Sequence, residues 1–310
     1  MRPFAGDAVS KVAVLFPGQG AQAVGMVGGW ADGHPKVRDL FDLAGSILGY
    51  DLEAICRSGP KEKLDTTAVS QPALLVTSLA ALEVLAERDD SPLGSVAAAA
   101  GLSLGEYTAL VFAGAIEPAD AIRVVAERGR AMQECAERTP GMMVAVLGLD
   151  REVVAGLCDE ARGKDVLSVA NVLCPGNVVV SGQRPACERL ETAAAAAGAM
   201  KCVRLDVAGA FHTPLMQDAV DRLSAVLAGI EVRPPRIPVV SNVDALPHDD
   251  PGEIRRLLAR QVCGVVEWHR SMEHLLAAGV DHFWEIGPGR VLRGLLKRIN
   301  RAAKASGIPD

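Results

Sequence analysis

The stretch SVAAAAGLSLGEYTALVFA, residues 95–113, joins a run of small apolar residues to a Gly-x-Ser-x-Gly turn and then to an apolar run with helical character. We expect a buried strand over 95–100 and a helix over 106–113, with Ser103 at the sharp turn between them. A serine on such an elbow is held in a strained backbone, so its neighbours must be small. The following helix presents backbone N–H groups towards developing negative charge. This stretch predicts a nucleophilic serine in an α/β fold.

Strands and helices alternate on both sides of the elbow. Buried strands are expected over 11–16 and 282–286, and long helices over 71–88 and 119–137. Alternation of this kind favours a parallel sheet with helices packed on its faces.

The section between Gly141 and Asp206 differs in the order of its expected strands and helices. It predicts strands and helices in the order βαββαβ, which is typical of a ferredoxin-like unit. We therefore expect an α/β fold of two subdomains. Residues 1–138 and 207–310 would form a large, α/β-hydrolase-like subdomain with a parallel sheet, and 139–206 a small ferredoxin-like insertion. The tail from Ala302 is expected to fray.

Composition narrows the function classes. The formal net charge is -6 and no Lys/Arg-rich cluster stands out, so nucleic acid is not expected as a partner. The longest apolar stretches, such as 96–101, are too short to span a bilayer. The seven cysteines include no CxxC pair, which indicates free thiols in a reducing cytoplasm and no zinc site.

A serine needs a base, and six histidines are available. His212 is set apart because it follows the apolar stretch 207–211 at the point where the insertion returns to the large subdomain. Clefts form at such junctions. Position alone leaves open a catalytic and a buried structural histidine. Asp206 is a formal candidate for the acid of a serine-hydrolase triad.

Several blocks resemble the malonyl-CoA:acyl-carrier-protein transacylases of fatty acid synthesis and the acyltransferase domains of polyketide synthases. The resemblance runs from Phe16 to about Leu296 and is specific only when the blocks are taken together. They are Phe16–Gln22, Gly101–Tyr107, Arg128–Gln133, Ala170–Asn171, Pro175–Val179, Gly209–Met216 and Glu285–Gly289. Departures from the family pattern include Leu102 in place of a usual His, Gly264 and Val265 in place of Asn and Pro, and Asn177 in place of Gln.

The resemblance implies that Ser103 is the nucleophile and His212 the general base. Gln19 and the backbone N–H of Leu104 would form the oxyanion hole. The backbone carbonyl of Gln261, instead of an Asp, would orient the histidine.

The same resemblance implies a set of substrate-binding residues. Arg128 would hold the free carboxylate of a malonyl group through a two-pronged pair. Asn171 corresponds to an amide near the active site. Phe211 would fill the space that an α-methyl group needs.

The implied reaction moves a malonyl group from malonyl-CoA to the phosphopantetheine thiol of acyl carrier protein, in ping-pong order and without a metal or cofactor. The expected protein is a cytoplasmic monomer that binds neither membrane nor nucleic acid. The alternatives are a serine hydrolase or thioesterase of the α/β-hydrolase type, an acyltransferase subunit of a polyketide or malonate decarboxylase system, and a non-catalytic subunit that docks a carrier protein.

Overall fold

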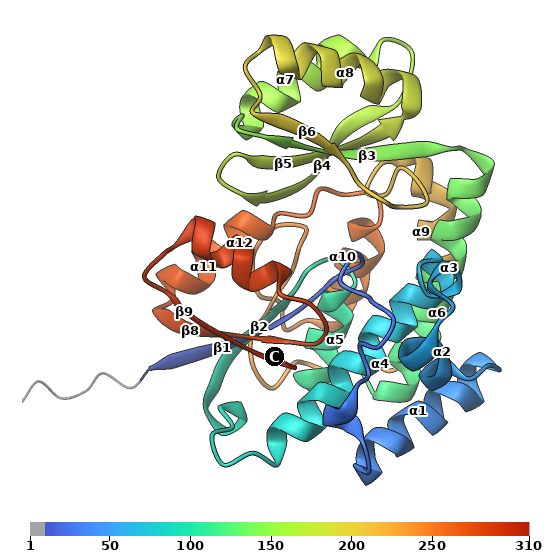
Figure 1. The fold of residues 1–310 in the computed structure, drawn as a ribbon, viewed down its shortest axis with the longest axis vertical. Helices are drawn as coiled ribbons and strands as arrows, with labels where there is room; N and C mark the ends of the chain where they lie inside the picture. The colour runs from blue at the N-terminus through green and yellow to red at the C-terminus, as the bar shows by residue number, and fades with distance from the viewer. Residues whose placement is uncertain (1–9, 310) are drawn as a thin grey trace, which may run out of the picture.

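A computed structural model of the chain describes residues 10–309, and two β-sheets organise them (Figure 1). The first sheet has the order β7-β2-β1-β8-β9 and is parallel throughout. The second has the order β4-β5-β3-β6 and is antiparallel. The strands are β1 Lys11–Phe16, β2 Val96–Gly101, β3 Gly141–Leu147, β4 Leu167–Cys174, β5 Asn177–Gln183, β6 Lys201–Arg204, β7 Val239–Val240, β8 Val280–Ile286 and β9 Lys304–Ile308.

Helices cover both faces of the parallel sheet, α4, α5 and α6 on one side and α11 and α12 on the other (Figure 1). The helices are α1 Pro35–Leu48, α2 Leu52–Ser58, α3 Lys61–Leu64, α4 Thr67–Ala86, α5 Gly105–Phe112, α6 Pro118–Arg138, α7 Arg151–Arg162, α8 Arg184–Ala196, α9 Gln217–Ala228, α10 Pro251–Gln261, α11 Trp268–Ala277 and α12 Val291–Ile299. Short 3₁₀ turns occupy Gly29–Ala31, Leu93–Ser95 and Pro214–Met216.

Strand β1 lies at the centre of the parallel sheet. Its Val14 and Phe16 belong to the core beneath α4 and α6, whereas Leu15 packs on the opposite face with Trp268 and Phe283. A parallel strand covered on both faces must be apolar along its whole length, which is why this stretch shows no polar alternation. The expected α/β fold with a parallel sheet is confirmed.

The antiparallel sheet carries α7 and α8 on its outer face and lies above the rest of the molecule in Figure 1. Its strand order, with β3 and β5 at the centre, is that of a ferredoxin-like unit. All of its elements fall between residues 141 and 204. We propose subdomain boundaries after residue 138 and after residue 206.

Backbone hydrogen bonds tie the two sheets together. The N–H of Val172 donates to the carbonyl of Val266 at 3.0 Å, and the N–H of Val266 donates to the carbonyl of Ala170 at 2.8 Å. The edge of β4 that does not pair with β5 is thereby joined to the segment just before α11. The small subdomain is held over the carboxyl ends of β1 and β2, where ligands of open parallel sheets bind.

The expectation of a frayed tail from Ala302 is wrong. Residues Lys304–Ile308 form β9, which pairs in parallel with β8, and the N–H of Gly287 donates to the carbonyl of Ile308 at 2.8 Å. The local sequence is small and polar, so its strand conformation comes from the open edge of β8 and not from intrinsic preference.

Among the described residues, α4 is the one helix long and apolar enough to cross a membrane by composition, and 78% of that window is buried inside the fold. It packs against α6 in the large core. A buried core helix has the same composition as a membrane span, so this property alone supports no membrane role.

The elbow after β2 touches the end of β1 without any side chain between them. A Cβ atom on Gly105 would lie 2.1 Å from the carbonyl oxygen of Phe16, and one on Gly101 would lie 1.9 Å from the carbonyl carbon of Gly105. The N–H of Leu102 donates to the same Phe16 oxygen at 3.0 Å. Both glycines are therefore required by backbone contact.

We predict that Gly105→Ala lowers the free energy of unfolding by about 2 kcal/mol or more, because a side chain forced into a packed site typically costs about 1–3 kcal/mol and here it meets backbone. The matched control is Gly156→Ala on α7, where nothing lies within 4 Å of the added atom. That variant should gain about 0.5–1 kcal/mol from helix propensity. Urea unfolding curves measure both, and equal stability of Gly105→Ala and the unsubstituted protein would contradict the contact.

Candidate active site

A cavity of about 440 Å³ lies between the two subdomains. Its floor is formed by the loop after β1, the elbow after β2 and Arg128 of α6, and its roof by residues of β3, β4 and β5. The segment that returns from the insertion, 205–212, closes one side. Ser103, His212 and Arg128 therefore face a common space, and its volume is in the usual range for small-molecule sites.

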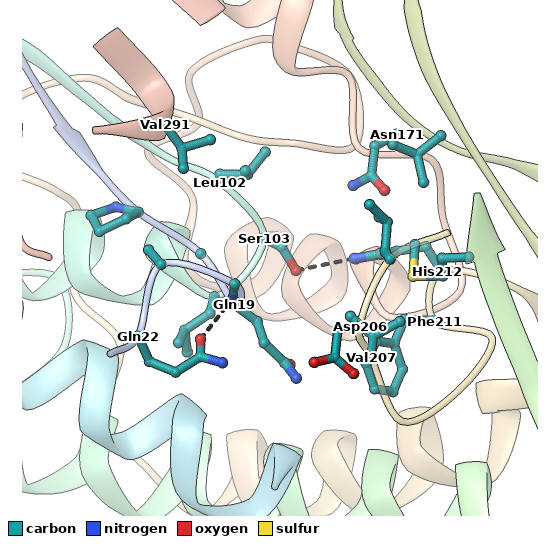
Figure 2. A pocket seen from close by; sticks show the side chains of 18 of the residues that line it. Gln19, Gln22, Leu102, Ser103, Asn171, Asp206, Val207, Phe211, His212 and Val291 are labelled. Atoms are coloured by element: carbon teal, nitrogen blue, oxygen red, sulfur yellow. Dashed lines mark hydrogen bonds between the residues drawn. The ribbon is translucent and has the colours of Figure 1, made fainter. Parts of the chain in front are cut away.

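Ser103 adopts a left-handed backbone with φ 48°, as expected for a residue on a strained elbow. Its side chain is half-buried and faces the cavity. The Oγ atom lies 3.1 Å from Nε2 of His212, the contact drawn as a dashed line in Figure 2. The serine and histidine that the sequence singled out are thus a hydrogen-bonded pair, as nucleophilic catalysis requires.

His212 is buried, with φ 60°, and its Nδ1 lies 2.8 Å from the carbonyl oxygen of Gln261. A carbonyl only accepts, so Nδ1 carries the proton and Nε2 is left as an acceptor for the Ser103 hydroxyl. Burial, with a smaller contribution from the charge of Arg128, lowers the pKa of His212 to about 4. The imidazole is therefore neutral and able to act as a base at physiological pH.

Asp206 does not complete a hydrolase triad. It is exposed, and Figure 2 shows its side chain apart from the Ser103–His212 pair. The Gln261 carbonyl occupies the position that the acid of such a triad would need, at Nδ1 of His212.

Arg128 is 1% exposed and donates to three neutral acceptors: Oε1 of Gln71 at 2.8 Å, Oγ of Ser103 at 3.0 Å and Oε1 of Gln261 at 2.9 Å. It forms no salt bridge with any described carboxylate. Burial lowers the pKa of this guanidinium from its usual value, although arginine stays charged. A buried cation without a direct counter-ion, facing a cavity, is a site for an anionic group.

The loop after β1 is ordered by Gln22, whose Oε1 accepts from the N–H of Gly20 at 2.7 Å (Figure 2). The side chain of Gln19 is directed to Thr67 Oγ1, with Nε2 at 3.4 Å. The backbone N–H groups of Gln19 and Leu104 donate to no other described residue. An oxyanion contribution from Gln19 would thus use its backbone N–H.

Asn171 and Phe211, which the family resemblance placed near the active site, both line the cavity. Asn171 reaches it from β4, and Figure 2 shows its amide directed inward above His212. Phe211 is 4% exposed and belongs to the large core. Leu102 lies near Val291 of α12 at the upper edge of the cavity, so the position where the family usually has His is apolar here (Figure 2).

Sequence reasoning missed Asn242 and Gln71. Asn242 accepts from the N–H of Ser103 at 2.6 Å and donates to the carbonyl of Gly101 at 2.8 Å, so its amide clamps both sides of the elbow. Its position just after a buried strand could have indicated a site residue, because ligands bind at the carboxyl ends of the strands in open parallel sheets. Gln71 could have been noticed as a large polar side chain in the predominantly apolar α4, because a buried polar group needs a hydrogen-bond partner.

Glu106 lies in the first turn of α5. Its carboxylate accepts from the N–H of Asn242 at 3.0 Å and from Nε2 of Gln261 at 2.7 Å. Burial raises the pKa of Glu106 to about 7. These donors come from α10 and from the segment after β7, so the contacts of Glu106 are set by the tertiary structure.

Comparison with known proteins agrees with this geometry. The profile of the acyl transferase domain family matches residues 14–307. The malonyl CoA-acyl carrier protein transacylase of Escherichia coli is 43% identical over 302 residues, which is 97% of either chain.

Two solved structures are also similar. An acyl carrier protein S-malonyltransferase from Vibrio cholerae is 41% identical over 97% of each chain, with a TM-score of 0.91. A malonyl-transacylase in complex with a type II PKS acyl-carrier protein is 41% identical, with a TM-score of 0.92, over 97% of this chain and 96% of that chain. Similarity of this extent in sequence and fold, together with the serine, histidine and arginine that meet in the cavity, shows that this chain belongs to the malonyl-CoA:acyl-carrier-protein transacylase family of acyl transferases.

Proposed function

We propose that this chain transfers a malonyl group from malonyl-CoA to the phosphopantetheine thiol of an acyl carrier protein, through an ester on Ser103. The observation that carries the proposal is Arg128, a buried guanidinium without a carboxylate partner that contacts the reacting oxygen at 3.0 Å. An acyl group with a free carboxylate would supply the missing counter-ion while its thioester carbon lies at Ser103. The names of the similar proteins support the same substrate and carrier.

The chemistry runs in two half-reactions. His212 Nε2 takes the Ser103 proton as Oγ attacks the thioester carbon, and the imidazolium then protonates the departing CoA thiolate. The carrier thiol, deprotonated by His212, attacks the resulting malonyl ester, and the imidazolium returns the proton to Ser103 Oγ as the ester bond breaks. The backbone N–H groups of Gln19 and Leu104 are proposed to bind the oxyanion of both tetrahedral intermediates, and removal of one such donor typically costs about 10²–10³ in rate.

Two further cavity residues are proposed to act on the acyl group. The Phe211 ring, which is packed into the core, would leave little space beside the α-carbon. One additional methyl group in a tight pocket is worth about 1–3 kcal/mol, so selection against methylmalonyl should be incomplete. The amide of Asn171 would contribute a polar contact from the roof of the cavity.

The proposed partner is an acyl carrier protein. The similarity to a malonyl-transacylase in complex with a type II PKS acyl-carrier protein supports a polyketide carrier as a second candidate. We propose a monomer, to be checked by light scattering. The seven cysteines are free thiols, which supports a reducing location such as the cytoplasm.

Mass spectrometry of the acyl-enzyme tests the proposal. After incubation with malonyl-CoA we expect the peptide that contains Ser103 to carry a malonyl group, more than after methylmalonyl-CoA, and Ser103→Ala to carry none. Addition of phosphopantetheinylated acyl carrier protein should discharge the ester onto the carrier. Rapid discharge to water without the carrier would identify a hydrolase instead.

Arg128→Ala should lower the rate of malonyl loading by about 10²-fold, because truncation of one partner of a buried charge pair costs about 2–5 kcal/mol. Loading by acetyl-CoA, which lacks the carboxylate, should fall less, so the malonyl/acetyl ratio decreases. Arg130→Ala on the same helix is the control, since its side chain is exposed and pairs with Glu127. Equal losses for malonyl and acetyl groups would rule out the carboxylate clamp.

A further inference from the structure

Glu106 is a buried carboxylate without a direct cation. Glu267 and Glu285 are also buried, but each pairs with an arginine: Arg151 at 2.7 Å and Arg293 at 3.3 Å, respectively. Among the described residues, Glu106 forms no salt bridge. A buried carboxylate is costly, so the contacts that it makes instead are informative.

One oxygen of Glu106 accepts two of its hydrogen bonds. Oε2 accepts from the Asn242 N–H at 3.0 Å and from Nε2 of Gln261 at 2.7 Å. An ionised carboxylate only accepts hydrogen bonds, so the amide of Gln261 must present its NH₂ group here. Its Oε1 then faces Arg128, whose Nη2 donates to it at 2.9 Å. One neutral amide thus bridges a buried carboxylate and a buried cation, and Glu106 holds its NH₂ end while Arg128 holds its oxygen.

This orientation extends to the nucleophile. Arg128 Nη2 also donates to Ser103 Oγ at 3.0 Å, so the hydroxyl must direct its own proton elsewhere, and His212 Nε2 is the acceptor at 3.1 Å. Gln261 contributes twice more, since Nε2 donates to the Ser103 carbonyl at 3.1 Å and its backbone oxygen accepts from His212. Hydrogen bonds thus link Glu106 through Gln261 and Arg128 to Ser103, and Arg128, which can only donate, leaves His212 as the acceptor of the Ser103 proton.

A second set of hydrogen bonds connects Glu106 to the elbow through Asn242. The carboxylate holds the backbone N–H of this residue, and the Asn242 amide clamps the elbow through Ser103 N–H and the Gly101 carbonyl. Ser103 has a positive φ, a conformation that persists only when its surroundings hold it.

We propose that Glu106 is a positioning residue of the acyl-transfer site, whose ionised, acceptor-only carboxylate orients Gln261 and thereby holds Arg128, Ser103 and His212 in reacting geometry. This inference rests on the proposed function only for the identity of the acyl group.

The test is a double-substitution cycle with Glu106→Gln and Gln261→Leu. Glu106→Gln keeps an acceptor but can also turn a donor towards Gln261, and Gln261→Leu removes the bridging amide while leaving the backbone carbonyl. The readout is the rate at which a fluorophosphonate probe labels Ser103, with loss of fluoride. A labelling rate about tenfold lower is expected for Glu106→Gln, the size of one charge-assisted hydrogen bond. Because the amide oxygen introduced by Glu106→Gln can still accept from the Asn242 N–H, the double variant should be no slower than Gln261→Leu alone.

Losses that multiply in the double variant, or unchanged labelling in Glu106→Gln, would overturn the proposal. The matched control is Glu267→Gln, a buried carboxylate that has its own arginine and should label at the unsubstituted rate. Failure of malonyl loading in the unsubstituted protein would refute the proposed function without affecting this cycle, because the probe carries no malonyl group. The malonyl/acetyl loading ratio should also fall in Glu106→Gln, since Arg128 loses its fixed position.

A pH profile of the unsubstituted protein gives a readout that does not require any variant to fold. The groups that face Glu106 are Arg128 from α6, Tyr107 of its own helix, Ser241 and Asn242 after β7, and Gln261 from α10. Because the pKa of Glu106 is about 7 and that of His212 about 4, labelling should fall in two separate steps as the pH decreases. The upper step should be absent in Glu106→Gln. A profile without a step near the pKa of Glu106 would contradict the proposal.

Discussion

The contact between the Ser103 elbow and the end of β1 is the constraint on which the rest of the site depends. The backbone of Gly105 lies against the carbonyl of Phe16, and the N–H of Leu102 donates to the same oxygen. With no side chain between the two strand ends, the loop that begins at Pro17 must run directly beside the elbow. That proximity brings residues of the loop and of the helix start, including Gln19 and Leu104, to the same cavity.

Arg128 and His212 have only neutral hydrogen-bond partners among the described residues, and this determines the electrostatics of the site. Arg128 is held by the oxygens of Gln71, Gln261 and Ser103, and His212 by a backbone carbonyl. A carboxylate in either place would cancel the positive charge or repel an incoming anion. Neutral acceptors orient both side chains and leave the charge of Arg128 without a direct counter-ion among the described residues. We infer that this is why the compensating carboxylate, Glu106, stands one amide away.

The two-subdomain architecture explains why the site is enclosed. The carboxyl ends of β1 and β2 form an open edge, and the antiparallel sheet, joined through Val172 and Val266, covers it. The return of the chain from the insertion delivers Phe211 and His212 to the gap. A site between two packed units limits the access of water, as the proposed ester intermediate requires.

The sequence alone determined the parallel sheet, the βαββαβ insertion and the elbow, because each depends on local periodicity and on small residues at fixed spacing. It also singled out Ser103 and left His212 open between a catalytic and a structural histidine, and the family resemblance added the expected roles of His212, Arg128 and the Gln261 carbonyl. Tertiary structure alone decided that 304–308 form a strand, since the edge of β8 supplies the pairing. It alone revealed the roles of Asn242, Gln71 and the Glu106–Gln261 bridge. These are hydrogen bonds between residues more than 50 positions apart, and the direction of a hydrogen bond has no periodic signature in the chain.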